Sequence, residues 1–167
     1  MTPQDIVVTR WGARFLNRRF PCTVGRGGIV PTGKKREGDG ATPAGVHRIV
    51  GMLYRPDRMA RPADWALPIG PCDLWSDDPR DEEYNLMVRV PHRFSHERLR
   101  RPDPMYDLIL ITDWNWPHAD AGRGSAIFVH QWRRPLARTA GCVAFARDDL
   151  HWVAPRITHQ TRLIIRG

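Results

Sequence analysis

Residues 125–145 read SAIFVHQWRRPLARTAGCVAF and place a histidine at the end of an apolar run and a cysteine directly after a glycine. The β-branched and aromatic residues up to Gln131 predict a buried strand, with His130 near its end. A basic, proline-bearing loop follows, and a Thr-Ala-Gly-Cys turn leads into a second apolar run. One histidine and one cysteine make neither a redox pair nor a complete zinc site. They fit a nucleophile and its base.

The turn around Cys142 offers the groups that a cysteine nucleophile needs. Such a residue requires a base within hydrogen-bond reach and backbone N–H groups that hold an oxyanion. Gly141 permits a tight turn because it has no Cβ, and Thr139 can hydrogen-bond locally and stabilise the turn. A helix beginning just after the turn would add positive potential and lower the thiol pKa. His130 is the histidine nearest by sequence, although a buried cysteine and a satisfied histidine are the commoner fates of either residue alone.

Short strands, rather than long helices, dominate the pattern along the chain. Loops rich in Gly, Pro, Asp and Asn separate the apolar runs, and 15 prolines with 14 glycines leave little room for long helices. The predicted strands span residues 5–10, 46–53, 85–90, 107–112, 125–131 and 162–167. Helices are predicted at 146–157, with Asp148 and Asp149 in the first turn, and at 91–101. We expect a single domain, residues 1–167, with a mostly β, mixed sandwich or barrel-like fold and one or two short helices.

The chain is basic, with a formal net charge of +8, which suits a polyanionic partner. Of its 26 basic residues only Lys34 and Lys35 are lysine, and the arginines are scattered from Arg10 to Arg166. No helix-turn-helix, zinc-finger or ribonucleoprotein pattern occurs, so we expect no nucleic-acid function. No apolar run approaches the roughly 20 residues of a membrane-spanning helix, so we expect no membrane insertion. No signal peptide is visible in the opening MTPQDIVVTRWGARF. We expect a monomer.

Two further motifs suggest no chemistry of their own. With three cysteines a disulfide framework is not expected, so Cys22 is interpreted as a core residue and Cys72 as core or loop. The run GIVPTGKK from Gly28 comes close to a phosphate loop, but Lys35 stands where a Ser or Thr is needed and no helix follows.

Neither of two candidate metal-binding groups has a complete ligand set. His92 and His96 are spaced to share one helix face, but spacing implies no third ligand, so a solvated face is the simpler interpretation. Asp77 and Asp78 fit an acidic surface loop that balances nearby arginines. We therefore expect no metal and no organic cofactor.

The segment IFVHQW…TAGCVAF resembles the catalytic segment of the L,D-transpeptidase (YkuD-like) family, in which a histidine precedes a Ser/Thr-x-Gly-Cys turn. REGDGATPAGVHRI is similar to the DG-x-TP-x-G loop and following strand of that family. WSDDP…EEYN, YDLILITDWN and GRGSAIFVH resemble segments of its compact, single-domain branch and occur in the expected order. The resemblance runs from about Gly33 to the end of the chain and implies a β-rich catalytic domain. The catalytic residues that it implies are Cys142, His130, Gly141 and Thr139.

Two positions depart from the pattern of that family. Many members have His-Gly-Cys where this chain has Ala140 before the glycine, and many have an arginine where this chain has Ala144. The compact branch often lacks that arginine, but another basic residue must then bind the substrate carboxylates. The candidates are the three arginines of the loop between the catalytic pair, Arg133, Arg134 and Arg138.

The resemblance implies a peptidoglycan L,D-transpeptidase whose partners are stem peptides. A thiolate at Cys142 would attack the carbonyl of an L residue, with His130 managing the protons and N–H groups around Gly141 holding the oxyanion. The thioester would pass to the side-chain amine of diaminopimelate on a second stem. The donor is either L-Ala at position one or diaminopimelate at position three, which gives a 1-3 or a 3-3 crosslink. The short chain and its two departures slightly favour the 1-3 linkage.

An extended peptide also needs a groove, and aromatic and amide side chains are expected to line it, although each aromatic is as often core. The residues assigned to that groove are Trp75, Tyr84, Asn85 and Asn115, with Trp114 and Trp116 as further aromatic candidates.

Three alternatives remain at this point. Water in place of the amine would make the same site an L,D-carboxypeptidase or endopeptidase, and nothing in the sequence separates transfer from hydrolysis. A non-catalytic wall-binding module would need neither Cys142 nor His130.

The substrate implies a periplasmic or cell-wall-associated location.

Overall fold

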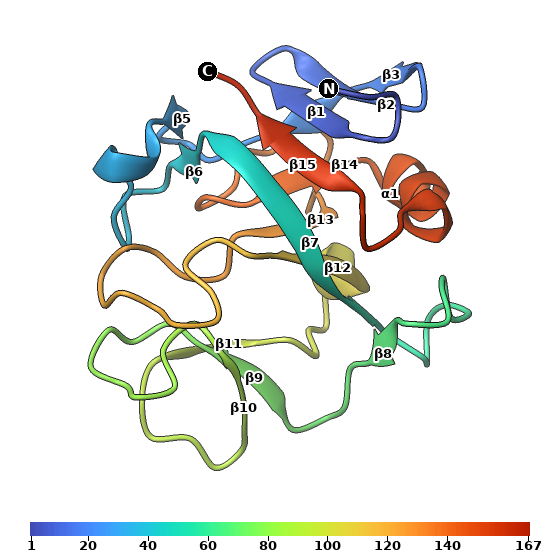
Figure 1. The fold of residues 1–167 in the computed structure, drawn as a ribbon. Helices are drawn as coiled ribbons and strands as arrows, with labels where there is room; N and C mark the ends of the chain where they lie inside the picture. The colour runs from blue at the N-terminus through green and yellow to red at the C-terminus, as the bar shows by residue number, and fades with distance from the viewer.

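The computed structural model describes residues 1–167 and consists mainly of short strands (Figure 1). The strands are β1 (Ile6–Thr9), β2 (Gly12–Phe15), β3 (Arg18–Phe20), β4 (Cys22–Thr23), β5 (Ile29–Val30), β6 (Thr42–Pro43), β7 (Gly45–Tyr54), β8 (Leu67–Pro68), β9 (Asp73–Ser76), β10 (Met87–Arg89), β11 (His96–Arg98), β12 (Leu108–Thr112), β13 (Phe128–Gln131), β14 (Val143–Phe145) and β15 (Arg162–Ile165). The single α-helix is α1 (Arg147–Val153), and 3₁₀ turns occupy Thr32–Lys34, Pro104–Tyr106 and Ala154–Arg156. The expected mostly β, barrel-like fold is confirmed.

The large sheet has the strand order β3-β2-β1-β15-β7-β12-β13-β14-β4, with β8 beside β7. The β1–β15 and β13–β14 pairs are parallel and the other neighbours in this order are antiparallel, so the sheet is mixed. Strand β7 crosses the molecule obliquely in Figure 1. Its first residues pair with β15 and its later residues, from Ile49, pair with β12. One long strand therefore connects the two halves of the sheet and lets it curl.

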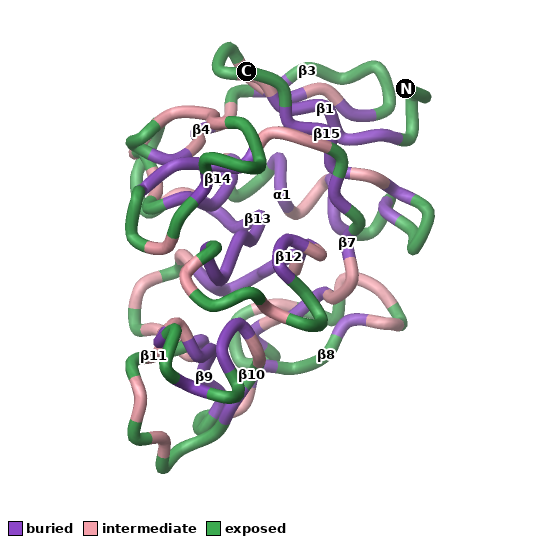
Figure 2. The backbone as a smooth tube through the Cα atoms, turned by 60° about the vertical axis from the view of Figure 1, so that its left-hand side comes forward, coloured by how far each residue is buried: buried purple, intermediate pink, exposed green.

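The two faces of this sheet carry separate apolar cores, because alternate residues of a strand point to opposite sides. On β12, Leu108 and Leu110 join the larger cluster, which contains Leu150 of α1. Ile109 lies between them and joins the smaller cluster, together with Phe128 of β13. Figure 2 shows the buried backbone concentrated in the strands around β12 and β13, with the exposed segments in the surrounding loops.

A small antiparallel sheet, β10-β9-β11, covers the face with the smaller core. Trp75 of β9 packs edge-on against Phe128 of the large sheet, with ring centroids 4.9 Å apart. The loops that connect these strands leave part of this face uncovered, and the cavities described below open there.

One of the two predicted helices is confirmed and the other is wrong. The helix expected at 146–157 forms as α1 and the 3₁₀ turn after it, with Asp148 and Asp149 in the first turn. The segment 91–101 is instead a loop that leads into β11, which pairs with β9 through the register Glu97–Trp75. The fully buried Leu99 follows that strand. The segment has no apolar stripe with which a helix could pack against the core. Its pairing with β9 therefore decides its structure.

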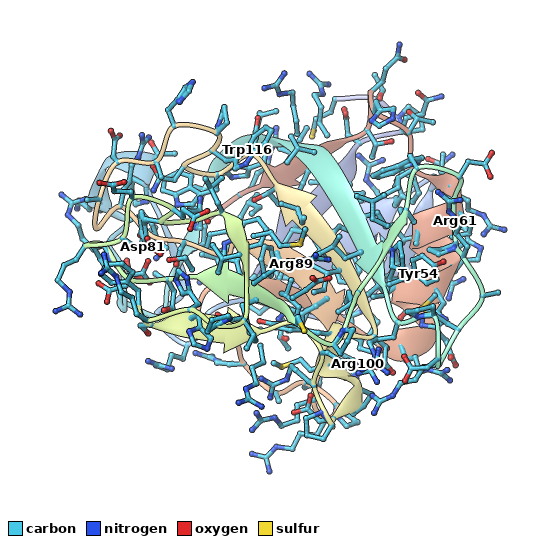
Figure 3. All side chains as sticks on the ribbon, turned by 90° about the horizontal axis from the view of Figure 1, so that it is seen from below. Tyr54, Arg61, Asp81, Arg89, Arg100 and Trp116 are labelled. Carbon is cyan, nitrogen blue, oxygen red and sulfur yellow. The ribbon has the colours of Figure 1, made fainter.

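Basic side chains project from most of the molecular outline, as the scattered arginines predict (Figure 3). Arg61 and Arg100 are examples that lie on well-separated parts of the view. No helix has the length and apolarity needed to cross a membrane.

Candidate active site

Cys142 lies in the turn that precedes β14, beside the start of β13. The parallel register aligns Val129 with Val143, so Cys142 comes next to Phe128 on the face of the smaller core. Its thiol donates to the Ala126 carbonyl at 3.0 Å, and its sulfur accepts the Phe128 N–H at 3.4 Å. The residue is 8% exposed. The backbone of the 126–128 segment therefore holds the thiol in one orientation.

His130 points to the same side of the sheet as Phe128, because the two residues are separated by one position along β13. Its Nδ1–H donates to the carbonyl of Gln131 at 2.8 Å. Because a carbonyl can only accept, this bond assigns the ring proton to Nδ1 and leaves the Nε2 lone pair free. The ring of Tyr106 packs edge-on against the imidazole, with centroids 5.3 Å apart. His130 and Cys142 line one cavity of about 840 Å³, which we call the large cavity.

Burial keeps both members of this pair uncharged. It raises the pKa of the Cys142 thiol to about 12, with a further contribution from the negative charge of Glu97. It lowers the pKa of His130 to about 4. At neutral pH the resting site therefore holds a thiol and a neutral imidazole rather than an ion pair.

The expectation that a helix N-terminus lowers the Cys142 pKa is wrong. Helix α1 begins at Arg147, at the far end of β14. At roughly 3.3 Å per strand residue this places the helix end more than about 10 Å from the thiol, and the helix field falls off within a turn. Desolvation is then the dominant influence on the thiol.

Hydroxyl groups on both sides hold the cysteine turn. The Thr139 hydroxyl donates to the Cys142 carbonyl at 2.6 Å and accepts the Gly141 N–H at 3.2 Å. From the opposite side, the Thr42 hydroxyl donates to the Gly141 carbonyl at 2.7 Å and accepts the Gly25 N–H at 2.8 Å. The DG-x-TP-x-G loop, which contains Thr42, therefore clamps the catalytic turn directly.

Gly141 is the residue that this turn requires. Its φ is +150°, and a Cβ there would meet the Ala41 carbonyl oxygen at 3.0 Å. We predicted that N–H groups around Gly141 and Cys142 would hold the oxyanion. The Gly141 N–H instead donates to the Thr139 hydroxyl, which leaves one of these donors. The Cys142 N–H has no acceptor in the protein.

The large cavity is strongly basic. All three arginines expected to bind carboxylates line it, namely Arg133, Arg134 and Arg138. Three more that the sequence did not suggest also line it, namely Arg26, Arg98 and Arg101. Ala144, where many family members carry an arginine, is fully buried in the sheet beside His130. The positive charge therefore comes from the loops and from β11 instead of from β14.

A second, smaller hollow of about 190 Å³ lies on another side of Cys142, and we call it the small hollow. It shares Arg26, Glu97, Ala140 and Cys142 with the large cavity. The small hollow differs in charge, because its other charged residues are Lys35, Glu37 and Asp77.

The four residues assigned to a peptide groove lie behind the walls instead of lining either cavity. Asn85 accepts from the Trp75 indole and from the Ala126 N–H, and its amide donates to the carbonyls of Trp114 and Asn115. The Asn115 side chain binds backbone groups of its own loop. The Tyr84 hydroxyl accepts the Gly124 N–H and donates to Glu37.

These four side chains are buried, and their polar atoms all have hydrogen-bond partners within the protein. Asn85 in particular supports Ala126, whose carbonyl accepts the thiol proton. The structure places these side chains in the support of the wall around Cys142, and their contact with substrate stays a prediction. Trp114 is also buried, whereas Trp116 is 37% exposed and lies in the upper part of the view in Figure 3.

Three site residues escaped the sequence interpretation. Thr42 lay in the quoted DG-x-TP-x-G loop, but only tertiary contact connects it to the turn. Glu97 and Tyr106 are joined by a hydrogen bond from the tyrosine hydroxyl to the carboxylate, and both line the large cavity. No apolar alternation marks the segment around Glu97 as a strand, since its apolar residues Phe94 and Leu99 are five positions apart. Three His, Cys, Asp or Glu side chains do not come together anywhere as a possible metal site.

A curled, mixed β-sheet with a cysteine and a histidine at one cavity is the arrangement expected of a cysteine-type catalytic domain. The sequence profile of the YkuD L,D-transpeptidase catalytic domain matches residues 5–165. The chain therefore belongs to this family, whose members are generally cysteine-dependent acyltransferases that act on peptidoglycan. No curated protein sequence matches the chain.

Proposed function

We propose that the protein is a peptidoglycan L,D-transpeptidase in which Cys142 is the nucleophile and His130 its base. The observation that carries this proposal is the pair itself: a held thiol and an imidazole with a free Nε2 line the same cavity. The alternative of a buried cysteine and a satisfied histidine does not account for the cavity or for the free imidazole nitrogen.

The neutral resting pair determines the first step. As the sulfur attacks the carbonyl carbon of the L residue, the thiol proton moves to Nε2 of His130. The Nδ1 bond to Gln131 holds the ring while the imidazolium exists. The unpaired Cys142 N–H is available to stabilise the oxyanion. The leaving amine then takes the proton from His130, and its departure leaves a thioester on Cys142.

The basic large cavity supports an acidic donor. Stem peptides carry several carboxylates, and an arginine can bind a carboxylate through two parallel hydrogen bonds. Arg133 and Arg134 are exposed on the connecting loop, and Arg138 lies at its other end. The thioester is then transferred to the side-chain amine of diaminopimelate on a second stem, as a 1-3 or 3-3 crosslink. This activity belongs in the periplasm or the cell wall.

Incubation of purified sacculi with the enzyme, followed by mass analysis of the muropeptides, tests the proposal. We expect new crosslinked dimers and, separately, a single covalent adduct on Cys142 after treatment with a carbapenem. Cleaved stems without dimers would support the hydrolytic alternative, in which water accepts the acyl group. Absence of both adduct and product would support a wall-binding module.

A further inference from the structure

Glu97 occupies a position that the steps above do not use. It lies on β11, is partly buried and lines both the large cavity and the small hollow, as Cys142 does. Its carboxylate accepts a hydrogen bond from the hydroxyl of Tyr106, whose ring packs against His130. The negative charge of Glu97 raises the pKa of the Cys142 thiol, so it acts directly on the reacting sulfur.

The small hollow also contains an acid without a partner. The Oδ1 atom of Asp77 is buried and has no hydrogen-bond partner. Of the other charged groups in the hollow, Glu37 accepts from Tyr84 and Ser125, Lys35 donates to Asp39 at 2.8 Å, and Arg26 is shared with the large cavity. Glu97 and Asp77 are therefore the acids available to a cationic group that enters beside the thiol.

We propose that the small hollow receives the primary ammonium group of the acceptor stem and that Glu97 is the base that removes one of its protons. This inference rests on the proposed function, since it concerns the second half of that reaction. The two spaces differ in charge in the sense that the two substrates need: six arginines and one carboxylate line the large cavity, whereas three carboxylates, with Arg26 and Lys35, line the small hollow.

The step balances as follows. The ammonium transfers one proton to the Glu97 carboxylate, and the resulting amine attacks the thioester carbonyl. The new C–N bond forms and the C–S bond breaks, which releases the Cys142 sulfur. The second ammonium proton leaves the nitrogen and goes to that sulfur through His130, which restores the thiol. Glu97 then returns its proton to solvent, so one proton is released for each amide formed.

Glu97 suits this role because His130 already carries the second proton to the sulfur in this step, so a separate group must take the first. Burial and the charges of Asp77 and Glu37 raise the pKa of Glu97, against the opposing effects of the Tyr106 hydrogen bond and of Arg101. A carboxylate with a raised pKa takes protons more readily than an ordinary one, and an entering cation would relieve its repulsion with Asp77.

Single-turnover kinetics of Glu97→Gln separates the two halves of the reaction. The glutamine keeps an oxygen that accepts from Tyr106, so the variant retains the local hydrogen bond. The enzyme is first acylated with a tetrapeptide stem, and a diaminopimelate-containing tripeptide is then added as acceptor. We expect acylation within about twofold of wild type, and aminolysis slowed about 100-fold at pH 7, the size of a typical general-base contribution.

The pH profile identifies the base. The defect should shrink toward pH 10, where an amine with a pKa of about 10.4 is increasingly deprotonated without help. Glu97→Asp should recover part of the rate at pH 7, and Asp77→Asn should raise the KM for the acceptor with little change in acylation. Glu82→Gln, which removes the same charge from an exposed position outside both spaces, is the control and should match wild type.

Three results would overturn the inference. Aminolysis by Glu97→Gln equal to wild type at pH 7 would show that another group removes the proton. Equal loss of acylation and aminolysis, unchanged by pH, would assign Glu97 a structural role only. If the wild-type enzyme forms no acyl-enzyme with the stem or with a carbapenem, the proposed function fails and the inference fails with it.

Discussion

The two faces of the large sheet are built from the same strands but have different fates. On one face, α1 covers an apolar cluster that includes Leu110 and Leu150, both fully buried. On the other, the three short strands around β9 cover only part of the surface, and Cys142 and His130 lie at the edge of that cover. Along β13, Val129 packs in the larger cluster, whereas His130 points to the face with the large cavity. The proposed reactive groups are accessible because the small sheet around β9 leaves this part of the face uncovered.

The largest expected effect concerns the thiol. Cys142→Ala should abolish crosslinking of sacculi and carbapenem labelling, because no other group on the open face replaces the nucleophile. The fold should persist, because the change removes only one small side chain from the smaller cluster. Thermal unfolding and mass analysis measure the two properties. Cys22→Ser and Cys72→Ser should keep most activity, and wild-type crosslinking by Cys142→Ala would disprove the mechanism.

The next effect is acid destabilisation through His130. Its pKa is lowered to about 4 in the fold, so between about pH 6.5 and pH 4 the unfolded chain binds the extra proton. The stability present above pH 6.5 should thus fall as the pH drops to 4, by on the order of 3 kcal/mol from this group. Urea unfolding at several pH values across this range should show that the free energy of unfolding of His130→Gln depends less steeply on pH than that of wild type. Burial also lowers the pKa values of His47 and His151, and these contribute equally to both proteins.

A pair of buried threonines tests whether the hydroxyl bridge at the Cys142 turn affects the chemistry as well as the stability. Thr42→Val leaves the Gly25 N–H and the Gly141 carbonyl without their partner, at a cost of about 1–3 kcal/mol. We also expect acylation by a carbapenem to slow about tenfold, because the turn is held less firmly. This corresponds to an increase of about 1.4 kcal/mol in the activation free energy.

Thr161→Val is the matched control. This hydroxyl is equally buried and accepts one backbone N–H, from Thr158, in the loop before β15. Its loss should lower stability without changing the acylation rate of the folded protein. Slower acylation in both variants would mean that lost stability, and not the bridge at the Cys142 turn, slows the reaction.

The smallest expected effect concerns the arginines of the connecting loop. Arg138→Ala, or the double change at Arg133 and Arg134, should raise the KM for acidic stems about tenfold, because exposed charges are partly screened. Labelling by neutral iodoacetamide should be unchanged. Stems with amidated carboxylates give the decisive comparison: if amidation weakens binding equally in wild type and variants, the loop is only a connector.

Most of the fold could be predicted because its signals are local. The strands β1, β7, β12, β13 and β15 follow from apolar, β-branched runs, and α1 follows from its acidic first turn and the proline that limits it. Strands of two or three residues, such as β4 and β8, were missed because so short a run has no measurable period. The segment around Glu97 was assigned to a helix from its local pattern alone. Its pairing partner, β9, is distant in sequence and leaves no signal within the segment.

The proposed catalytic centre divides in the same way. The sequence by itself predicted the reactive pair and the turn, since Thr139, Gly141 and Cys142 lie close together in the chain and His130 lies near the end of the neighbouring strand. Only the tertiary structure decided the protonation of that pair, because desolvation depends on what surrounds a group and here outweighs the distant helix field. Tertiary packing also brought Thr42 and Glu97 to the thiol. Their roles follow from contacts between segments far apart in the chain, and no pattern within one segment encodes such contacts.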